Sequence, residues 1–128
     1  SKNIFFNKND LIKLKSDDHI IGLHSHSHPL NMSKKSYKKQ YNEYFKNKNI
    51  LEKLLKKKDT ISINSMAYPM GLYNKDSFKI LNSLNIDYGF ISSITSRERN
   101  RLVGKNNNLT IPREDCSNII ENINEIYN

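Results

Sequence analysis

Three histidines fall within five residues, at His24, His26 and His28, and Pro29 follows directly. This segment strongly constrains the fold, because two of its imidazoles can share a metal ion only if the backbone bends. In an extended strand, His24 and His28 would lie roughly 13 Å apart at about 3.3 Å per residue, whereas nitrogen ligands bind zinc at about 2 Å. In a turn, residues i and i+4 share one face. The sequence therefore predicts a bend directly after Leu23, kept short because Pro29 disfavours the helical region for His28.

The segments around this cluster predict alternating strands and helices. Apolar runs and turn residues predict strands over 20–23, 60–68, 86–91 and 109–113, and helices over 9–16, 33–58, 74–84 and 117–126. The expected N-caps are Asn9 or Asp10, Ser33 or Ser36, Asn74 and Ser117. Residues 92–108 are polar and predict a long loop. This order implies an α/β fold with a largely parallel sheet.

Composition sets broader limits. A chain of 128 residues is long enough for one domain with a modest core. Cys116 is the only cysteine, so an internal disulfide is excluded and the redox compartment stays open. No apolar run is long enough to span a bilayer. No signal peptide is recognisable in these residues, and the localisation is left unassigned.

The net charge of +8 raises the question of nucleic-acid binding. The helix predicted over 33–58 carries Tyr37, Tyr41 and Tyr44 among many lysines, and aromatic rings beside cations can stack bases. The alternative is an amphipathic helix whose tyrosines pack on a sheet. We favour this alternative, because the aromatic residues and the lysines fall on different faces of the helix.

Two motifs resemble those of the polysaccharide deacetylases, the carbohydrate esterases with a NodB homology domain. Residues 20–29 resemble the family's His-Ser/Thr-x-x-His motif with its preceding apolar strand, and place His24 and His28 at the metal-binding positions. Residues 68–71, Tyr-Pro-Met-Gly, are similar to the Tyr-Pro-x-Gly form of the family's third motif. Residues 111–113, Ile-Pro-Arg, resemble the end of a late strand. The resemblance covers roughly residues 9–115.

The resemblance implies a distorted (β/α) barrel. Residues 1–128 would form a single domain corresponding to the C-terminal two-thirds of that barrel, incomplete at its N-terminus. An incomplete barrel exposes a sheet edge. We therefore expect that two copies could pair as a homodimer.

The resemblance also implies a hydrolase acting on C–N bonds other than peptide bonds, which removes acetyl groups from an N-acetylated, or O-acetylated, glycan. His24 and His28 would bind a divalent metal, with zinc as the first expectation. The metal would polarise the acetyl carbonyl and activate a water. The N–H of Met70, held by the turn at Pro69, would stabilise the oxyanion, and Tyr68 would line the site.

Two further residues are candidates for supporting roles. Arg113 follows the Ile-Pro pair of the late strand, and Asp115 lies two residues beyond it. Arg113 would either form an internal salt bridge with a carboxylate, for which Asp115 is the candidate, or orient a catalytic group. The sequence leaves both alternatives open.

Several family features have no match in this chain. The paired aspartates of the first motif, which supply the third metal ligand and the general base, are unmatched, because Asp17 and Asp18 lie too close to His24. The late catalytic histidine is also unmatched. Ala67 and Met70 stand where the commoner third motif has arginine and tyrosine. The chain is therefore interpreted either as part of a longer deacetylase domain or as an inactive homologue.

Two other function classes stay open. The first is a non-catalytic module that binds a glycan or a protein partner, in which the histidines are ordinary surface residues. The second, less favoured, is a basic nucleic-acid-binding domain, whose affinity would fall steeply with salt. We expect an acetylated glycan, and no specific nucleic acid, as the partner.

Overall fold

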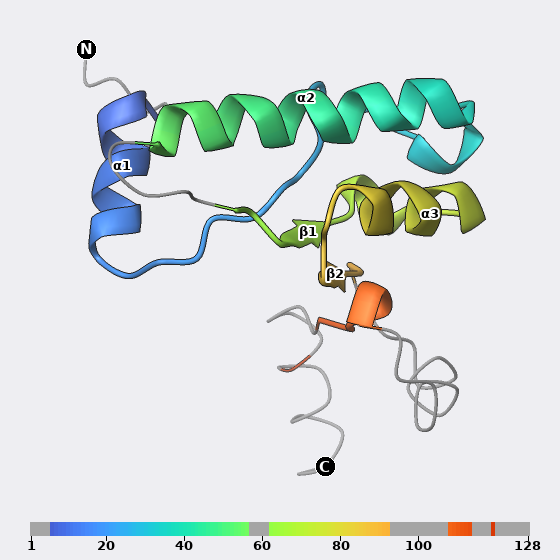
Figure 1. Cartoon of the computed structure of the whole chain (residues 1–128). Coiled ribbons are helices and arrows are strands. Elements are labelled where there is room, and N and C mark those ends of the chain that lie inside the picture. The colour runs from blue at the N-terminus through green and yellow to red at the C-terminus, as the bar shows by residue number, and fades with distance from the viewer. Residues whose placement is uncertain (1–5, 57–61, 93–107, 114–118, 120–128) are drawn as a thin grey trace, which may run out of the picture.

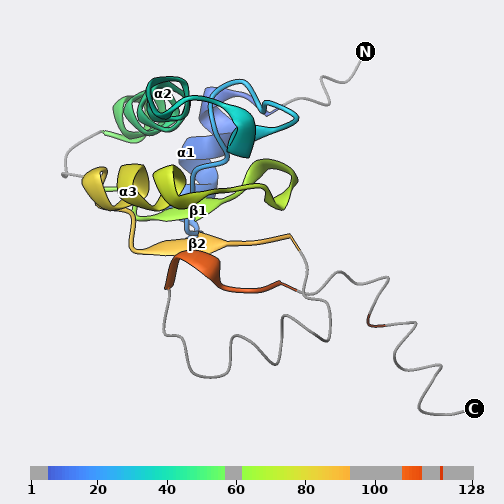
Figure 2. The ribbon, with the colours of Figure 1, turned by 90° about the vertical axis from the view of Figure 1, so that its right-hand side faces the viewer.

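The computed structural model describes residues 6–56, 62–92, 108–113 and 119. The helices are α1 (Lys8–Ser16), α2 (Tyr37–Leu55) and α3 (Lys75–Ser83), and the strands are β1 (Ser65–Ala67) and β2 (Tyr88–Phe90). Short 3₁₀ turns, η1 (Met32–Lys34), η2 (Pro69–Gly71) and η3 (Asn108–Thr110), lie between them. In both views α3 and β1 lie between α2 and β2 (Figures 1 and 2).

The sheet is parallel, as predicted. Ser65 pairs with Tyr88 and Ala67 with Phe90, in parallel register. Two single bridges, also parallel, extend this pairing on both sides: Leu23 with Met66, and Phe90 with Ile111. The α/β class is therefore confirmed, whereas the residues that the structure describes form an open parallel arrangement and no closed barrel.

The two faces of the sheet differ in their environment. Side chains alternate along a strand, and paired residues share a face. Met66 of β1 is fully buried, and Gly89, its partner on β2, is also buried. On the other face Tyr88 is 44% exposed, and Ala67 and Phe90 are only partly buried. The core is therefore built on the first face, from these residues: Leu23, Met32, Tyr44, Leu55, Ile63, Met66, Tyr68, Ile80, Leu81, Leu84, Ile86, Ile91 and Leu109.

Helix α2 follows Ser36, one of the two predicted N-caps, and its tyrosines divide between core and surface. Tyr44 is fully buried, which agrees with the amphipathic interpretation, but Tyr37 and Phe45 are each 44% exposed. The helix was expected to reach residue 58; it ends at Leu55, and residues 57–58 lie outside the described part. Because Tyr37 and Phe45 are partly exposed, fewer of its aromatic residues pack on the core than the sequence pattern suggests.

The N-caps of the other helices are partly as predicted. Asn74 caps α3, as expected. Helix α1 is capped by Asn7, whose side chain accepts from the N–H of Asn9 and Asp10, while the Asp10 carboxylate accepts from the N–H of Asn7. The predicted caps Asn9 and Asp10 were therefore wrong, because both lie inside a reciprocal capping box that begins at Asn7.

The first predicted strand is much shorter than expected. Only Leu23 of residues 20–23 pairs with a neighbour, and its side chain is buried. Ile20, the first residue of this apolar run, is 82% exposed. It lies beside the open face of the sheet, where the described residues provide no covering layer. An apolar residue type therefore did not guarantee burial here.

The strand predicted over 60–68 is reduced to β1 for a different reason. Within the described part of that segment, the backbone of Ile63 bonds to side chains of α2 instead of to a strand. Its N–H donates to the Glu52 carboxylate at 3.0 Å, and its carbonyl accepts from Lys48 Nζ at 2.6 Å. Lys48 and Glu52 are themselves an ion pair at 3.3 Å, so one polar pair on α2 holds the chain as it approaches β1.

The last predicted elements are only partly described. The strand expected over 109–113 is a 3₁₀ turn, η3, followed by the single bridge at Ile111. The long loop is outside the described residues from position 93 to 107, and the helix expected over 117–126 is outside them except at Ile119. In the described part of the chain, no helix combines the length and apolar character that a bilayer span needs.

Candidate metal centre

The histidine cluster lies at the carboxyl edge of the parallel sheet. The N–H of Leu23 donates to the Ser65 carbonyl at 2.8 Å, and the N–H of Ala67 donates to the Leu23 carbonyl at 2.9 Å. Because parallel strands end at the same edge, His24 leaves the sheet next to the point where Tyr68 leaves β1. The two motifs of the sequence are therefore brought side by side.

The backbone bends after Leu23 through two left-handed residues. The φ angles of Ser25 and His28 are 66° and 48°, a region that residues other than glycine seldom adopt. The Ser25 hydroxyl accepts from the N–H of His28 at 3.1 Å, which closes the turn. The rings of His24 and His28 then lie with centroids 4.8 Å apart and planes inclined by 55°. The chain thus bends where a shared ion requires it, but without a helical turn.

One ring of the pair has a defined orientation. His24 Nδ1 lies 2.8 Å from the Ala67 carbonyl oxygen. A carbonyl only accepts, so Nδ1 carries the proton and donates it. Nε2 then has its lone pair free, which is the arrangement that metal-binding histidines show, with the second nitrogen fixed by a carbonyl or a carboxylate. The Ala67 carbonyl therefore fixes the orientation of the His24 ring.

The donor set fits part of a metal site. Catalytic zinc sites have three protein ligands, and His24 and His28 would supply two of them. Across the described ranges, no group of three or more His, Cys, Asp or Glu side chains is arranged to hold an ion. Asp17 does not contribute, since it pairs with Lys13 at 2.7 Å on the surface. A third ligand would have to come from outside the described residues.

The turn over 68–71 presents a backbone N–H. Gly71 donates to the Tyr68 carbonyl at 3.0 Å and Leu72 donates to the Pro69 carbonyl at 3.1 Å, whereas the N–H of Met70 has no acceptor among the described residues. Met70 has a φ of 54° and its side chain is 57% exposed. This N–H lies three residues after Ala67, whose carbonyl orients His24.

Two residues of this turn are buried. Pro69 begins η2, where its missing N–H is not needed, and its side chain is fully buried. Tyr68 is 1% exposed, and its hydroxyl donates to the Leu109 carbonyl at 2.9 Å. Burial, with neighbouring Tyr44 and Tyr73, raises the pKa of Tyr68 above its ordinary value. The Tyr68 side chain therefore anchors the turn in the core, and its expected place in the lining of the site stays a prediction.

Of the two candidates for supporting roles, only Arg113 lies among the described residues. Arg113 Nε donates to the Ile91 carbonyl at 3.0 Å, just beyond β2. No ion pair of Arg113 occurs among the described residues. Asp115 lies outside them. Arg113 therefore holds the backbone at the end of β2, a contact that neither sequence-based alternative included.

Sequence reasoning missed two residues of α2 that hold the histidine loop. The Glu43 carboxylate accepts from the N–H of Ser27 at 2.8 Å, from the Ser27 hydroxyl at 2.7 Å and from the N–H of His26 at 3.2 Å. Asn47 Oδ1 accepts from the N–H of His24 at 2.9 Å. The available signal was their i, i+4 spacing, which places both side chains on one helix face.

These contacts determine the charge of Glu43. Its partial burial by itself raises the pKa of the carboxyl. The hydrogen bonds from Ser27 and His26, together with the attraction of the His26 ring, outweigh this, so the pKa lies below its ordinary value of 4.5. Glu43 is therefore held as a carboxylate that only accepts.

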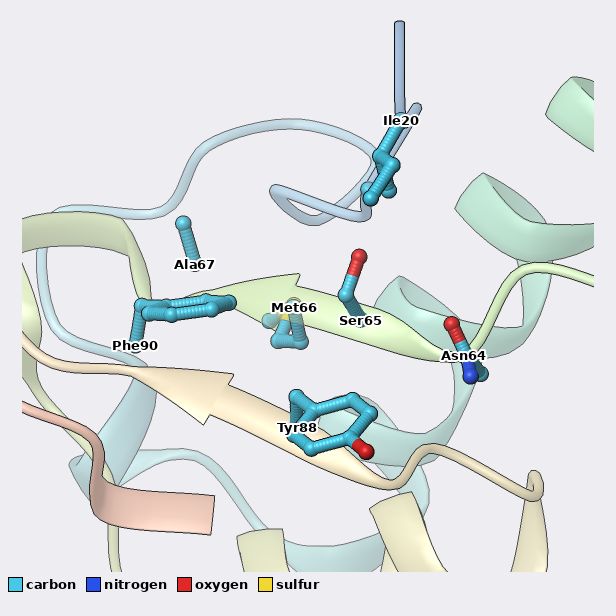
Figure 3. Close-up of a pocket in the computed structure, with 8 residues that line it drawn as sticks. Ile20, Asn64, Ser65, Met66, Ala67, Tyr88 and Phe90 are labelled. Carbon is cyan, nitrogen blue, oxygen red and sulfur yellow. The ribbon is translucent and has the colours of Figure 1, made fainter. Parts of the chain in front are cut away.

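A separate hollow of about 470 Å³ lies on the open face of the sheet. Figure 3 shows Tyr88 and Phe90 of β2 beside Ser65 and Ala67 of β1, with Ile20 across the hollow. Its lining is mostly apolar, and no histidine contributes to it. The hollow is thus distinct from the histidine pair, although Ala67 belongs to both surroundings.

Comparisons with known proteins agree with this arrangement. The family model described as polysaccharide deacetylase matches residues 1–89. The structure of the Streptococcus pyogenes deacetylase PplD in complex with acetate is similar, with a TM-score of 0.69 and 22% sequence identity over 89% of this chain and 46% of that one. The chain thus spans less than half the length of that protein. No curated protein sequence matches it. Since the family model covers more than half of the residues, the chain belongs to the polysaccharide deacetylase family.

Proposed function

We propose that this domain is part of a metal-dependent hydrolase that removes acetyl groups from an N-acetylated or O-acetylated glycan, with His24 and His28 as two of the metal ligands. Family membership supports a hydrolase of the deacetylase kind. A divalent metal such as zinc, when bound, would polarise the acetyl carbonyl and activate a water. The glycan and the metal are inferences from the resemblance and from the residues below.

The observation that carries this proposal is the pairing of the two imidazoles. Their centroids lie 4.8 Å apart, although the backbone needs two left-handed residues to bring them together. Each such residue costs about 1–2 kcal/mol, so contacts around the loop must hold it in this conformation. The proton of His24 is held by the Ala67 carbonyl, which leaves Nε2 free for an ion.

The chain's own residues would act as follows. His24 and His28 would direct nitrogen lone pairs toward one point at the carboxyl edge of the sheet. The N–H of Met70, free of any acceptor within the described part, would donate to the oxyanion that forms on the acetyl carbon. Pro69 and Gly71 would keep that N–H in place. Pro69 is buried in the core, and Gly71 allows the second of the two successive positive φ angles, at Met70 and Gly71, that the turn needs.

The test measures zinc binding and acetate release with the full-length native protein. We expect His24→Ala to lower the zinc affinity by more than about 100-fold, beyond what the loss of an outer-shell partner costs, and to abolish acetate release from an N-acetylglucosamine oligomer. Equilibrium dialysis and an acetate assay give the two readouts.

His26→Ala is the matched control. It removes the same side chain from the same loop, but the loop contact of His26 is made by its backbone N–H. We expect zinc affinity and acetate release to stay within about 2-fold of the native protein, because no ligand is lost. Absence of zinc binding in the native protein, or acetate release that survives His24→Ala, would refute the proposal.

A second candidate, a non-catalytic glycan-binding module, is favoured by the open hollow. Tyr88 is 44% exposed on its wall, and an exposed aromatic ring with an apolar floor is a common surface for binding small molecules. In that case Tyr88→Ala would lower affinity for the same oligomer in a titration, and His24→Ala would leave it unchanged. The reverse pattern would favour the enzyme.

A further inference from the structure

The backbone of the histidine loop is bonded to one face of α2. Four donors of the loop point to two side chains that lie one turn apart on that helix. Glu43 accepts from the two N–H groups of His26 and Ser27 and from the Ser27 hydroxyl, and Asn47 accepts from the N–H of His24. A rigid helix thus holds the segment on both sides of Ser25.

This support is needed because the loop conformation is costly. Ser25 and His28 both adopt left-handed backbone angles, and residues held there persist only where the surroundings impose them. The Ser25 hydroxyl contributes one bond inside the loop, to the N–H of His28. The bonds to the backbone N–H groups of His24, His26 and Ser27 come from α2, and the His24 ring bonds to the Ala67 carbonyl, so the ring pair depends on contacts far away in the sequence.

A carboxylate suits this position better than an amide. The donors use both oxygens of Glu43: Oε2 accepts the two N–H groups and Oε1 accepts the hydroxyl proton. Glutamine has the same size, but one of its two terminal atoms is an NH₂ donor. In one orientation of a glutamine side chain, this NH₂ would face the two N–H groups. In the other orientation the Ser27 hydroxyl would have to turn and accept from the NH₂, and the two N–H groups would bond to a neutral oxygen, which is a weaker acceptor than a carboxylate.

We propose that Glu43 is a positioning residue, which holds the His26–Ser27 segment so that the His24 and His28 rings face one another. The proposal rests on the proposed function for what the rings bind, but the ring geometry can be tested without any metal. Glu43 touches neither ring in the described contacts, so it acts through the loop backbone.

The experiment compares Glu43→Gln with Glu52→Gln in the full-length native protein. Glu52 lies on the same helix and also accepts a backbone N–H, that of Ile63 at 3.0 Å, so it matches the change in charge and the loss of a bond. Two readouts are taken: nuclear Overhauser contacts between the His24 and His28 rings without metal, and zinc affinity by competition with a chromophoric chelator.

We expect Glu43→Gln to lose the ring-to-ring contacts and to bind zinc about 10–100-fold more weakly, as for other outer-shell partners. Glu52→Gln should keep the contacts and bind zinc within about 2-fold of the native protein, because its bond lies away from the loop. Preserved contacts in Glu43→Gln, or equal losses in both variants, would overturn the proposal.

Two further arms keep the result decisive. If Glu43→Gln does not fold, Ser27→Ala removes only the hydroxyl bond to Oε1, and we expect it to weaken zinc binding about 3-fold and reduce the ring contacts; no change would overturn the proposal. If the native protein binds no zinc while Glu43→Gln still loses the ring contacts, the positioning role stands and the metal-dependent function fails.

Discussion

The histidine loop (residues 24–29) and the tyrosine–proline turn (residues 68–71) leave the sheet at the same edge but are held in different ways. Both contain two residues with positive φ: Ser25 and His28 in the loop, Met70 and Gly71 in the turn. Hydrogen bonds from two α2 side chains, Glu43 and Asn47, hold the loop. Packing holds the turn, with Pro69 and the ring of Tyr68 buried in the core.

This difference predicts two kinds of failure. A segment held by packing cannot shift without disturbing the core, so its defects should appear as lost stability. A segment held by polar contacts at the surface can exchange them for water, so its defects should appear as lost order at modest cost. The site therefore combines a fixed backbone donor with an adjustable pair of rings.

The largest effect is expected from Gly71→Ala in the turn. Gly71 has a φ of +66°, and an added Cβ would lie 2.1 Å from Ser92 Oγ and 2.9 Å from Ser92 Cβ. We expect roughly 2–4 kcal/mol of lost stability, from backbone strain and overpacking together. Urea denaturation of the native protein and the variant measures this loss.

The double variant Gly71→Ala with Ser92→Gly separates the two causes. It removes the side-chain clash, although the Ser92 backbone nitrogen stays 3.2 Å from the added Cβ, and it leaves the positive φ. We expect only part of the loss, about 1–2 kcal/mol, to remain. No recovery in the double variant, or no loss in the single variant, would show that packing does not hold the turn.

A smaller, pH-dependent effect is expected from Glu43→Gln in the loop. At neutral pH we expect about 1–2 kcal/mol of lost stability, because bonds to a partly exposed carboxylate are replaced. The pKa of Glu43 is lowered in the folded protein, below 4.5. Its contribution is therefore fully present above pH 4.5 and is lost as the pH falls through the folded pKa.

The measurement is the free energy of unfolding of both proteins, by urea denaturation, from pH 7 down to pH 3. The gap between native protein and variant should be constant at the upper end and should shrink below pH 4.5. A gap that stays constant or widens toward low pH would mean that the carboxylate does not stabilise the loop.

The smallest effects separate two buried tyrosines, one in the turn and one on the helix that holds the loop. Tyr68 of the turn donates to the Leu109 carbonyl, whereas the Tyr44 hydroxyl on α2 is buried without a hydrogen-bond partner among the described residues, and its burial raises its pKa to about 12. Tyr68→Phe should cost about 1 kcal/mol, and Tyr44→Phe should be neutral or stabilising. Equal losses in thermal unfolding would contradict this assignment.

Local patterns in the sequence predicted the parts of the fold that depend on neighbouring residues. The Asn74 cap and the bend after Leu23 each follow from a few adjacent residues, and the parallel sheet follows from the alternation of strands and helices. Burial did not follow in the same way. Ile20 is apolar and lies in an apolar run, yet it is exposed, because burial needs a covering layer that the run itself cannot indicate.

Long-range polar contacts were the other gap. Glu43 lies 16 residues after Ser27, and Asn47 lies 23 residues after His24. In the sequence both resemble ordinary solvated residues of a basic helix. Their partners are backbone N–H groups, which every residue carries, so no residue type in the loop indicates them. The burial of Tyr68 was not indicated for a related reason: a motif locates a residue in the chain but does not tell which way its side chain points.

The polar pair Lys48 and Glu52, which holds the backbone of Ile63, gives α2 a further property. The same helix bonds to the end of the first strand segment through Asn47 and to the segment before β1 through Glu52. The position of one strand segment relative to the other therefore depends on the distance and angle between these two side chains along α2. One residue inserted between positions 47 and 48 would rotate the Asn47 side chain by about 100° around the helix axis relative to the Glu52 side chain. Such an insertion would leave the helix intact but put the two strands out of step, and the rings with them.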